Sequence, residues 1–288
     1  MNSYINGHTK LTGLLGSPVS HSISPLMHNE AFKQLGLNYV YLCFDVNTDN
    51  LPTALEGLRQ LGVAGFNCTY PDKVRMFELA DELSDAARMM EAVNTVVNVD
   101  GKFIGHNTDG IGYMQSVKDA GFDIIGKQMT LLGAGGAATS IAVQAAIDGV
   151  ETLNIFARKS NSWSRAEALV DRIKKNTSCN VNLYDLNDKT LLKESIHNSA
   201  ILTNGTNVGM APNSDDSIIT DLDMFHENLI VSDIIYNPRE TKLMNLAKQV
   251  TPHVFNGLYM LLYQGSEAFK LWTGKDMPVD IIKEKYFS

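Results

Sequence analysis

Short apolar runs alternate with segments of helical period along nearly the whole chain. In the first part of the chain, three runs of this kind are followed by polar turn residues and read as strands, at residues 11–16, 39–46 and 63–67. A helix is expected after the first strand, with Ser24 as its cap and Pro25 in its first turn, where a missing N–H costs nothing. Another is expected over 51–61. Such alternation is typical of βαβ units in a mainly parallel sheet.

The pattern changes after Pro71 and then restarts. It predicts helices over residues 73–83 and 84–92, and a hairpin over 95–104 that turns at Asp100-Gly101. A further helix is predicted over 108–117, with Thr108 or Asp109 as its cap. The second half opens with a strand over 128–133, a glycine-rich turn and a helix over 136–148. Later strands are expected at 152–157, 180–184, 200–204, 229–233 and 253–255, and late helices at 258–272 and 278–286.

This order of elements predicts an α/β fold with two domains. We expect an N-terminal α/β substrate domain made of residues 1–109 with 258–288, and a Rossmann-like doubly wound nucleotide-binding domain over residues 110–257. Because no strand follows residue 258, the last two helices are expected to pack back against the first domain.

Bulk composition narrows the class of protein. With 44% hydrophobic and 19% charged residues, the 288-residue chain has a globular rather than a disordered composition. Its net charge of −8 gives no general attraction for nucleic acid or for an anionic membrane. The first ten residues lack the apolar core of a secretory signal, and no apolar run reaches the roughly 18 residues of a membrane span. We therefore expect a soluble, cytoplasmic protein whose partners are small molecules.

The cysteines give no sign of a metal or of a disulfide framework. Cys43, Cys68 and Cys179 lie far apart and form no CxxC pair, so buried free thiols are expected. No metal site is expected. The oligomeric state stays open, with a homodimer as one of the states that the sequence allows.

The glycine-rich turn has the context of a dinucleotide-binding loop, because it follows a predicted strand and opens a predicted helix. Gly133 would make the tight turn, Gly135 would let the backbone approach a pyrophosphate, and the helix N-terminus would offer free N–H groups. The alternative is a purely structural tight turn. The expected cofactor contacts are Gly133, Ala134, Gly135, Gly136 and Ala137.

The end of the next strand bears on the choice of cofactor. An acid at this point would hold the ribose hydroxyls of NAD, whereas a basic residue would accept the phosphate of NADP. The chain has Arg158 and Lys159 here and no acid between Ala157 and Arg165, which favours NADP. A plain solvated surface is the other interpretation of the two cations.

Polar residues gather just after three predicted strands, in segments 16–25, 65–73 and 105–110. In α/β sheets this rim binds ligands. Oxidation of an alcohol by hydride transfer needs a group that takes the hydroxyl proton, and Lys73 can do so with Asp109 to orient it and share the proton. Nearby hydroxyl and amide side chains can hydrogen-bond a polyhydroxylated acid: Ser22, Ser24, Thr69, Asn94 and Asn107.

Each of these residues also has a simpler interpretation. Lys73 fits an ordinary surface position on a helix, and the serines fit helix caps. His21 and His106 are either further acid/base candidates or plain loop residues. Only the occurrence of these residues together, just after predicted strands, favours a functional site.

Four motifs in this order resemble the shikimate dehydrogenase family, over essentially the whole chain. The family pattern His-Ser-x-Ser-Pro is matched by residues 21–25, and Asn-x-Thr-x-Pro-x-Lys by residues 67–73. Asn-Thr and Asn-Thr-Asp are matched by residues 94–95 and 107–109.

The resemblance implies an NAD(P)-dependent oxidoreductase that interconverts 3-dehydroshikimate and shikimate, on the pathway to chorismate and the aromatic amino acids. It implies that Lys73 is the proton acceptor and Asp109 its partner, and it places Ile234 and Gly257 beside the nicotinamide. The substrate contacts that it implies are Ser22, Ser24, Thr69, Lys73, Asn94, Asp109, Tyr236 and Gln264.

Departures from the family pattern leave the cofactor open between NADP and NAD. NADP-binding members usually have Asn-Arg-Thr where this chain has Ala157-Arg158-Lys159. Segments 204–206, 261–269 and 271–276 look more like the quinate/shikimate branch, which can use NAD. Two alternatives therefore stand beside the leading hypothesis: a quinate/shikimate dehydrogenase that prefers NAD, and a non-catalytic nucleotide or metabolite sensor.

Overall fold

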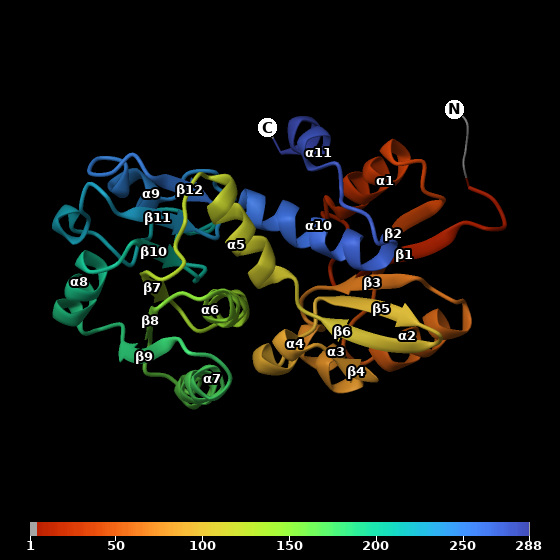
Figure 1. Ribbon diagram of the computed structural model, residues 1–288, viewed down its shortest axis with the longest axis horizontal. Helices are drawn as coiled ribbons and strands as arrows, with labels where there is room; N and C mark the ends of the chain where they lie inside the picture. Colours follow the sequence, from red (N-terminus) through yellow and green to blue (C-terminus); the bar gives the residue numbers. More distant parts are fainter. Residues whose placement is uncertain (1–4, 288) are drawn as a thin grey trace. The chain divides into compact units, whose positions relative to one another are not determined.

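The computed structural model describes residues 5–287 and divides the chain into two compact units (Figure 1). The first unit contains the chain up to Thr108 together with the segment from Leu262 onward, and the second contains Asp109–Leu261. The boundaries between the two domains were predicted from the sequence to follow residues 109 and 257. Each unit has its own six-stranded sheet and its own core.

The first unit is a mixed sheet with helices, in the strand order β2-β1-β3-β5-β6-β4. Strand β1 pairs in parallel with β2 and β3, while β5 is antiparallel to both β3 and β6. Its strands are β1 (Lys10–Gly16), β2 (Tyr39–Asp45), β3 (Gly65–Cys68), β4 (Glu82–Leu83), β5 (Thr95–Val99) and β6 (Lys102–His106). Its helices are α1 (Ser24–Gln34), α2 (Leu51–Gln60), α3 (Lys73–Leu79), α4 (Asp85–Met90), most of α10 (Leu258–Thr273) and α11 (Val279–Tyr286).

The predicted hairpin is confirmed, with β5 and β6 joined at Asp100-Gly101. Both turn residues have positive φ, 51° and 86°, which is what a two-residue turn of the hairpin type requires. The predicted helix over 73–83 is wrong at its end, since α3 stops at Leu79 and β4 follows. The Asp81 N–H donates to the Phe103 carbonyl at 3.0 Å, and the Asp81 carboxylate accepts the Phe103 N–H at 2.7 Å. Pairing with β6 therefore overrides the helical period.

Ser24 is the first residue of α1 rather than its cap, so this expectation was wrong. Ile23 occupies the cap position and provides no side-chain hydrogen bond. The Ser24 N–H donates instead to the Ser22 hydroxyl oxygen at 3.2 Å.

The second unit is a doubly wound parallel sheet in the order β12-β11-β10-β7-β8-β9. Counted from β7, this is the Rossmann order, with its topological switch point between β7 and β10. Its strands are β7 (Gln128–Leu132), β8 (Thr152–Ala157), β9 (Asn180–Asp185), β10 (Ile201–Asn204), β11 (Ile230–Asp233) and β12 (Val254–Asn256). The helices are α5 (Asp109–Asp119), α6 (Gly136–Asp148), α7 (Trp163–Asn176), α8 (Lys189–His197) and α9 (Lys242–Ala247), with the 3-10 turn Leu222–Met224.

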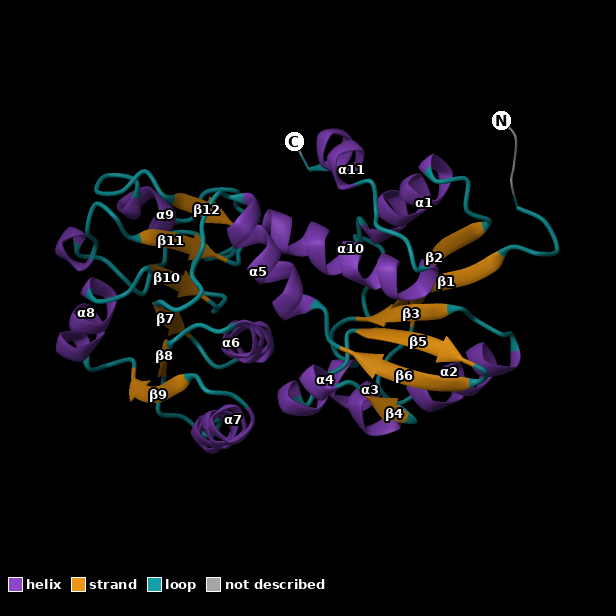
Figure 2. Ribbon diagram, in the orientation of Figure 1, coloured by secondary structure: helices purple, strands orange, loops and turns teal. Residues whose placement is uncertain are grey.

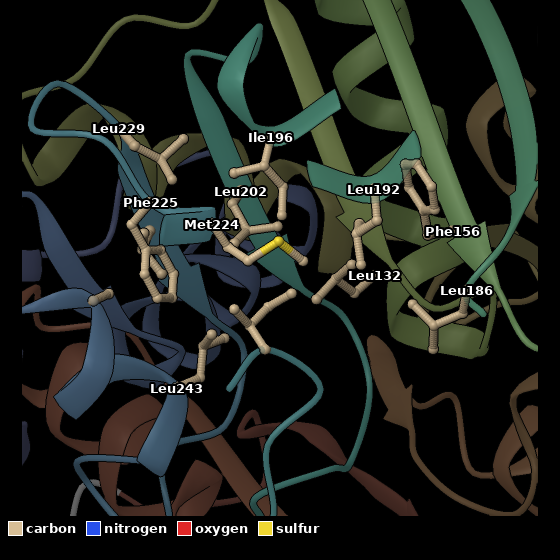
Figure 3. Close-up of a cluster of buried hydrophobic side chains, with 13 residues drawn as sticks. Leu132, Phe156, Leu186, Leu192, Ile196, Leu202, Met224, Phe225, Leu229 and Leu243 are labelled. Atoms are coloured by element: carbon tan, nitrogen blue, oxygen red, sulfur yellow. The ribbon is translucent and has the colours of Figure 1, made fainter. Parts of the chain in front are cut away.

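Helices cover both faces of the second sheet. Figure 2 shows α6 and α7 on one side of the strands and α8 and α9 on the other. On the α8 side, a cluster of buried side chains fills the space between sheet and helices (Figure 3), including Leu132, Phe156, Leu192, Ile196 and Leu202. Apolar burial of this kind is worth roughly 1.5–3 kcal/mol for each fully buried large side chain. It holds the strand ends that carry the loops described below.

The core of the first unit has an aliphatic and an aromatic part. Leu51, Leu55 and Leu58 of α2 pack with Met76 of α3 and with apolar residues of β1, β3, β5 and β6. The aromatic part is formed by His28 and Phe32 of α1, Tyr41 of β2, and Phe269 and Trp272 of α10. The Trp272 indole N–H donates to the Val96 carbonyl at 2.9 Å, which fastens α10 to β5.

Within residues 5–287, no helix has the length and apolar character needed to cross a membrane.

Candidate active site

A largely buried polar centre lies at the end of β3 and the start of β5 in the first unit. The Asn67 amide nitrogen donates to the Asn94 carbonyl at 3.1 Å and to the Thr95 hydroxyl at 2.9 Å. The Asn94 side-chain oxygen accepts from the Thr95 hydroxyl at 3.0 Å and from the Thr108 N–H at 2.8 Å. The Asn94 amide nitrogen reaches the Gln264 side-chain oxygen at 3.5 Å. The structure therefore brings together two predicted substrate contacts, Asn94 and Gln264, that are far apart in the sequence.

The loops after β1 and β3 run beside each other and carry the predicted hydroxyl groups. The Ser17 N–H donates to the Tyr70 carbonyl at 3.2 Å, and the Thr69 N–H donates to the Leu15 carbonyl at 2.9 Å. A Cβ on Gly16 would lie 2.4 Å from the Thr69 methyl carbon, so this position needs glycine. The pairing of the two loops puts Thr69 next to the segment that leads to Ser22 and Ser24.

Lys73 is the first residue of α3, and its side chain is half-buried. Its carbonyl oxygen accepts the Val93 N–H at 2.9 Å, which fixes the start of α3 beside the residue preceding Asn94. The neighbouring Asp72 is fully buried and accepts a hydrogen bond from the Thr48 hydroxyl at 2.9 Å. Burial raises the pKa of the Asp72 carboxyl, an effect that the Thr48 hydrogen bond opposes.

Asp109 is the first residue of α5 and is buried. It follows Thr108, whose N–H is held by Asn94. Asn107, expected to bind substrate, donates from its amide to the Ala92 carbonyl at 3.1 Å and so helps to hold this segment. His106 is half-buried, and burial lowers the pKa of its imidazole.

In the second unit, the glycine-rich loop lies at the switch point of the sheet. Gly133 has φ +100°, and a Cβ there would lie 2.7 Å from the Thr206 methyl carbon of the loop after β10. A Cβ on Gly135 or Gly136 would meet no heavy atom within 4 Å. The chain's own packing therefore requires glycine at Gly133 but leaves open space above Gly135 and Gly136, at the start of α6.

Arg158 and Lys159 follow β8 and are exposed. The Lys159 ammonium lies over the Trp163 ring, 5.6 Å from its centroid. Asp185, at the end of β9, is the register partner of Ala157, so the sheet brings an acid alongside the end of β8. Sequence reasoning missed this acid because it examined only the residues that follow β8 along the chain.

The ends of β11 and β12 are held by a buried carboxylate. Asp233 accepts hydrogen bonds from the Asn204 amide at 3.1 Å, the Ile235 N–H at 3.0 Å and the Thr241 hydroxyl at 2.7 Å. Burial raises the pKa of Asp233, and these three hydrogen bonds oppose that shift. The network orders the turn that carries Ile234 and Tyr236.

Gly257 follows β12 and lies against this turn. Its N–H donates to the Ile235 carbonyl at 3.2 Å, and a Cβ on Gly257 would come within 1.9 Å of the Ile234 carbonyl oxygen. The two residues expected to line the nicotinamide pocket are thus packed backbone to backbone. Tyr236, in contrast, is 46% exposed.

Sequence reasoning missed the residues that connect the polar centre. Tyr41 is completely buried, and its hydroxyl donates to the Asn67 side-chain oxygen at 2.8 Å. Thr95 and Thr108 contribute the other hydroxyl groups. A tyrosine inside an apolar strand carries no signal of this role in the sequence. Among the residues described, 5–287, no group of three or more His, Cys, Asp or Glu could hold a metal ion.

Two family models match the chain. The shikimate dehydrogenase substrate binding domain matches residues 14–96, which contain most of the polar centre. The shikimate 5'-dehydrogenase C-terminal domain matches residues 257–285, which contain Gly257 and Gln264.

Individual relatives are similar over nearly their full length. A shikimate dehydrogenase (NADP(+)) from Listeria monocytogenes is 48% identical over 283 residues, covering 98% of this chain and 97% of the relative. A crystal structure of shikimate 5-dehydrogenase from the same species, in complex with shikimate and NAD, has a TM-score of 0.95 and covers 99% of this chain and 98% of its own. Quinate dehydrogenase from Corynebacterium glutamicum, in complex with NAD, is 28% identical with a TM-score of 0.86, covering 97% and 99%. The chain therefore belongs to the shikimate dehydrogenase family.

Proposed function

We propose that this protein catalyses the reversible NAD(P)H-dependent reduction of 3-dehydroshikimate to shikimate, on the pathway to chorismate and the aromatic amino acids. The observation that carries the proposal is the buried amide and hydroxyl centre around Asn94, which suits a small, highly hydroxylated acid. The Listeria relatives, one named shikimate dehydrogenase (NADP(+)) and one solved with shikimate and NAD, support it.

In this proposal the first unit binds the substrate. The Ser22 and Ser24 hydroxyls receive the carboxylate, since hydroxyl donors in a partly buried site suit an anion. Amide and hydroxyl groups of this unit hold the substrate hydroxyls, and these residues are Thr69, Asn94 and Gln264. Tyr236, which belongs to the second unit, is a further substrate contact that the family resemblance implies.

Lys73 and Asp109 would act as the acid/base pair. When bound, the nicotinamide supplies or accepts the hydride. During reduction, Lys73 gives a proton to the carbonyl oxygen as it becomes a hydroxyl; during oxidation, Lys73 takes that proton back. Asp109 orients the lysine and shares its proton. No metal is needed for this step, because the proton transfer neutralises the developing alkoxide.

The second unit would bind the cofactor as NADP or NAD. Open space at Gly135 and Gly136 and the N–H groups at the start of α6 suit a pyrophosphate at the switch point. Arg158 and Lys159 would face the adenosine ribose, with Ile234 and Gly257 beside the nicotinamide. The remaining contacts would come from the backbone of Gly133, Ala134 and Ala137.

A quinate/shikimate dehydrogenase that prefers NAD is the second candidate. Asp185 beside the end of β8 favours it, because a carboxylate there would repel a ribose phosphate. The similarity to the quinate dehydrogenase from Corynebacterium glutamicum also fits.

Turnover of shikimate and of quinate, each with NADP and with NAD, is the experiment that tests these proposals. We expect a shikimate-dependent change in nicotinamide absorbance, with quinate turned over more slowly. Faster turnover of quinate with NAD than of shikimate with either cofactor would select the second candidate. Binding of shikimate or cofactor without turnover in any of the four assays would point instead to a sensor.

Replacing Gly135 by alanine tests the cofactor site. Since a Cβ at this position meets nothing in the protein, the melting temperature should not change, whereas the KM for the nicotinamide cofactor should rise about tenfold through one lost hydrogen bond to the pyrophosphate. Gly57→Ala on α2 is a matched control, because its Cβ also meets nothing within 4 Å. If the KM for the cofactor is the same in the two variants, the glycine-rich loop does not bind the cofactor.

A further inference from the structure

We propose that the Asn29 side chain takes the place of a neighbouring strand at the free edge of β2, and that it thereby keeps this edge from pairing with a second copy of the chain. The contacts that carry the proposal lie within the first unit. The proposal goes beyond the proposed function and does not depend on it, since neither substrate nor cofactor takes part.

Strand β2 is an edge strand whose sequence favours self-association. Within residues 5–287, it has a neighbouring strand on one side only, because the order of the first sheet begins with β2-β1. Residues 39–44 read Tyr-Val-Tyr-Leu-Cys-Phe, a run with no charge, no proline and no glycine. The Leu42 side chain is 45% exposed. Uncharged segments of about six residues with high β-propensity stack readily between chains, so an open edge with this sequence needs protection.

The hydrogen bonds between β1 and β2 show which backbone groups of β2 face outward. The Lys10 N–H donates to the Asn38 carbonyl at 3.0 Å. At the other end of the pair, the Val46 N–H donates to the Gly16 carbonyl at 3.0 Å. The N–H and C=O of one residue point to one side of a strand and those of the next residue to the other, so the even-numbered positions of β2 bond to β1. The N–H and C=O of Tyr41, in the middle of β2, therefore point to the free edge.

Asn29 forms hydrogen bonds with both of these outward groups. Its amide nitrogen donates to the Tyr41 carbonyl at 2.9 Å, and its side-chain oxygen accepts the Tyr41 N–H at 2.8 Å. One residue of an antiparallel neighbouring strand would make the same pair of bonds. Helix α1, which carries Asn29, packs against β2 (Figure 1). A second chain could pair with the middle of β2 only if it displaced this amide.

The opposite edge of the same sheet is protected in a different way. Strand β4 consists only of Glu82 and Leu83, and the Lys102 ammonium pairs with the Glu82 carboxylate at 3.0 Å. Short strands and charged side chains are common protection for sheet edges. Strand β2 has seven residues, and its one charged residue, Asp45, lies at its end. The protection of the middle of β2 is therefore left to Asn29.

Asn29→Leu is the central test, with Asn245→Leu as its matched control. Leucine is similar in size to asparagine but forms no side-chain hydrogen bond, so it leaves both Tyr41 groups open. Asn245 lies at an exposed position of α9 in the second unit, where the same change adds apolar surface away from β2. Hydrogen exchange of the Tyr41 amide should be about tenfold faster in Asn29→Leu than in the wild-type protein, through the lost hydrogen bond. Asn245→Leu should keep the wild-type rate.

Sedimentation velocity over a range of protein concentrations tests the second part of the proposal. Asn29→Leu should form a larger species whose share grows with concentration, whereas Asn245→Leu should sediment like the wild-type protein. Adding Leu42→Lys to Asn29→Leu should abolish the larger species while the Tyr41 amide still exchanges fast, because a charge on an edge strand opposes pairing. Association caused by general unfolding would not be removed in this way, since a lysine on an exposed strand position does not restore a lost fold.

Asn29→Ala removes the amide with a smaller side chain and should have the same effects, which covers the case that leucine does not fit. The proposal is overturned if the Tyr41 amide exchanges at the wild-type rate in both Asn29 variants, or if neither variant associates more than Asn245→Leu. Association that persists after Leu42→Lys is added would overturn it as well, because the added charge lies on β2 itself.

Discussion

Replacing Lys73 by alanine is expected to lower kcat for shikimate oxidation on the order of 10²-fold or more, while the KM for shikimate changes far less. The physical reason is that a lost acid/base group acts on the transition state, where the proton moves, and only weakly on the bound substrate. The measurement is steady-state kinetics with saturating cofactor, together with a thermal melt to show that the variant is folded.

Two further variants sharpen this result. Lys73→Met keeps the apolar stem of the side chain and removes only the ammonium group, so an equal loss of kcat would exclude lost packing as the cause. Lys102→Ala removes a lysine of the same unit that is exposed and paired with Glu82, and it should leave kcat unchanged. Turnover retained by Lys73→Ala would take this lysine out of the mechanism and leave His21 and His106 as the other acid/base candidates.

Replacing Gly257 by alanine is expected to destabilise the second unit by about 3 kcal/mol. The added Cβ would come within 1.9 Å of the Ile234 carbonyl oxygen, a contact with backbone that no side-chain rotation can relieve. The hydrogen bond from the Gly257 N–H to the Ile235 carbonyl holds the end of β12 against the turn that follows β11. The clash can be relieved only if these two segments move apart, which breaks this hydrogen bond. Overpacking in well-ordered regions costs roughly 1–3 kcal/mol and occasionally more, and this site lies at the upper end.

Unfolding of the full-length protein and its variants by a chemical denaturant, monitored by circular dichroism, would measure this loss of stability. Gly57→Ala is again the control, since its helix position is open and alanine should stabilise the protein by about 0.5–1 kcal/mol. Equal stability of the Gly257 and Gly57 variants would show that the close approach of Gly257 to Ile234 does not limit the stability of the protein.

Where local and long-range signals agreed, the sequence was sufficient to predict the fold. The hairpin at Asp100-Gly101 was predictable because its turn residues tolerate positive φ. The strand-glycine-helix order at β7 and α6 was predictable because apolar strand, turn and helix follow one another without a gap. In contrast, β4 could not be predicted, because its two residues are extended only through pairing with β6.

The residues of the candidate site also fall into some that could be predicted from the sequence and others that could not. The resemblance to the family identified Asn94 through its Asn-Thr motif, and it implied Gln264, which lies inside α10. Asp185 and Tyr41 were not visible, because each acquires its importance from a neighbouring strand or helix rather than from its own segment. Ser24 shows the opposite error: a serine before a proline looks like a cap, yet Ile23 occupies the cap position and the Ser24 N–H donates to the Ser22 hydroxyl.

The discontinuity of the first unit has a consequence for biosynthesis. Its sheet is complete at Thr108, but α10 and α11, which bring the Trp272 indole and the Lys285 ammonium that pairs with Glu30, are synthesised only after the whole of the second unit. The second unit, in contrast, is one uninterrupted stretch that can form while translation continues. Domains usually mature in the order of synthesis. Here the second unit would be the first to mature, and the first unit, although its synthesis begins earlier, would wait until α10 and α11 have been made.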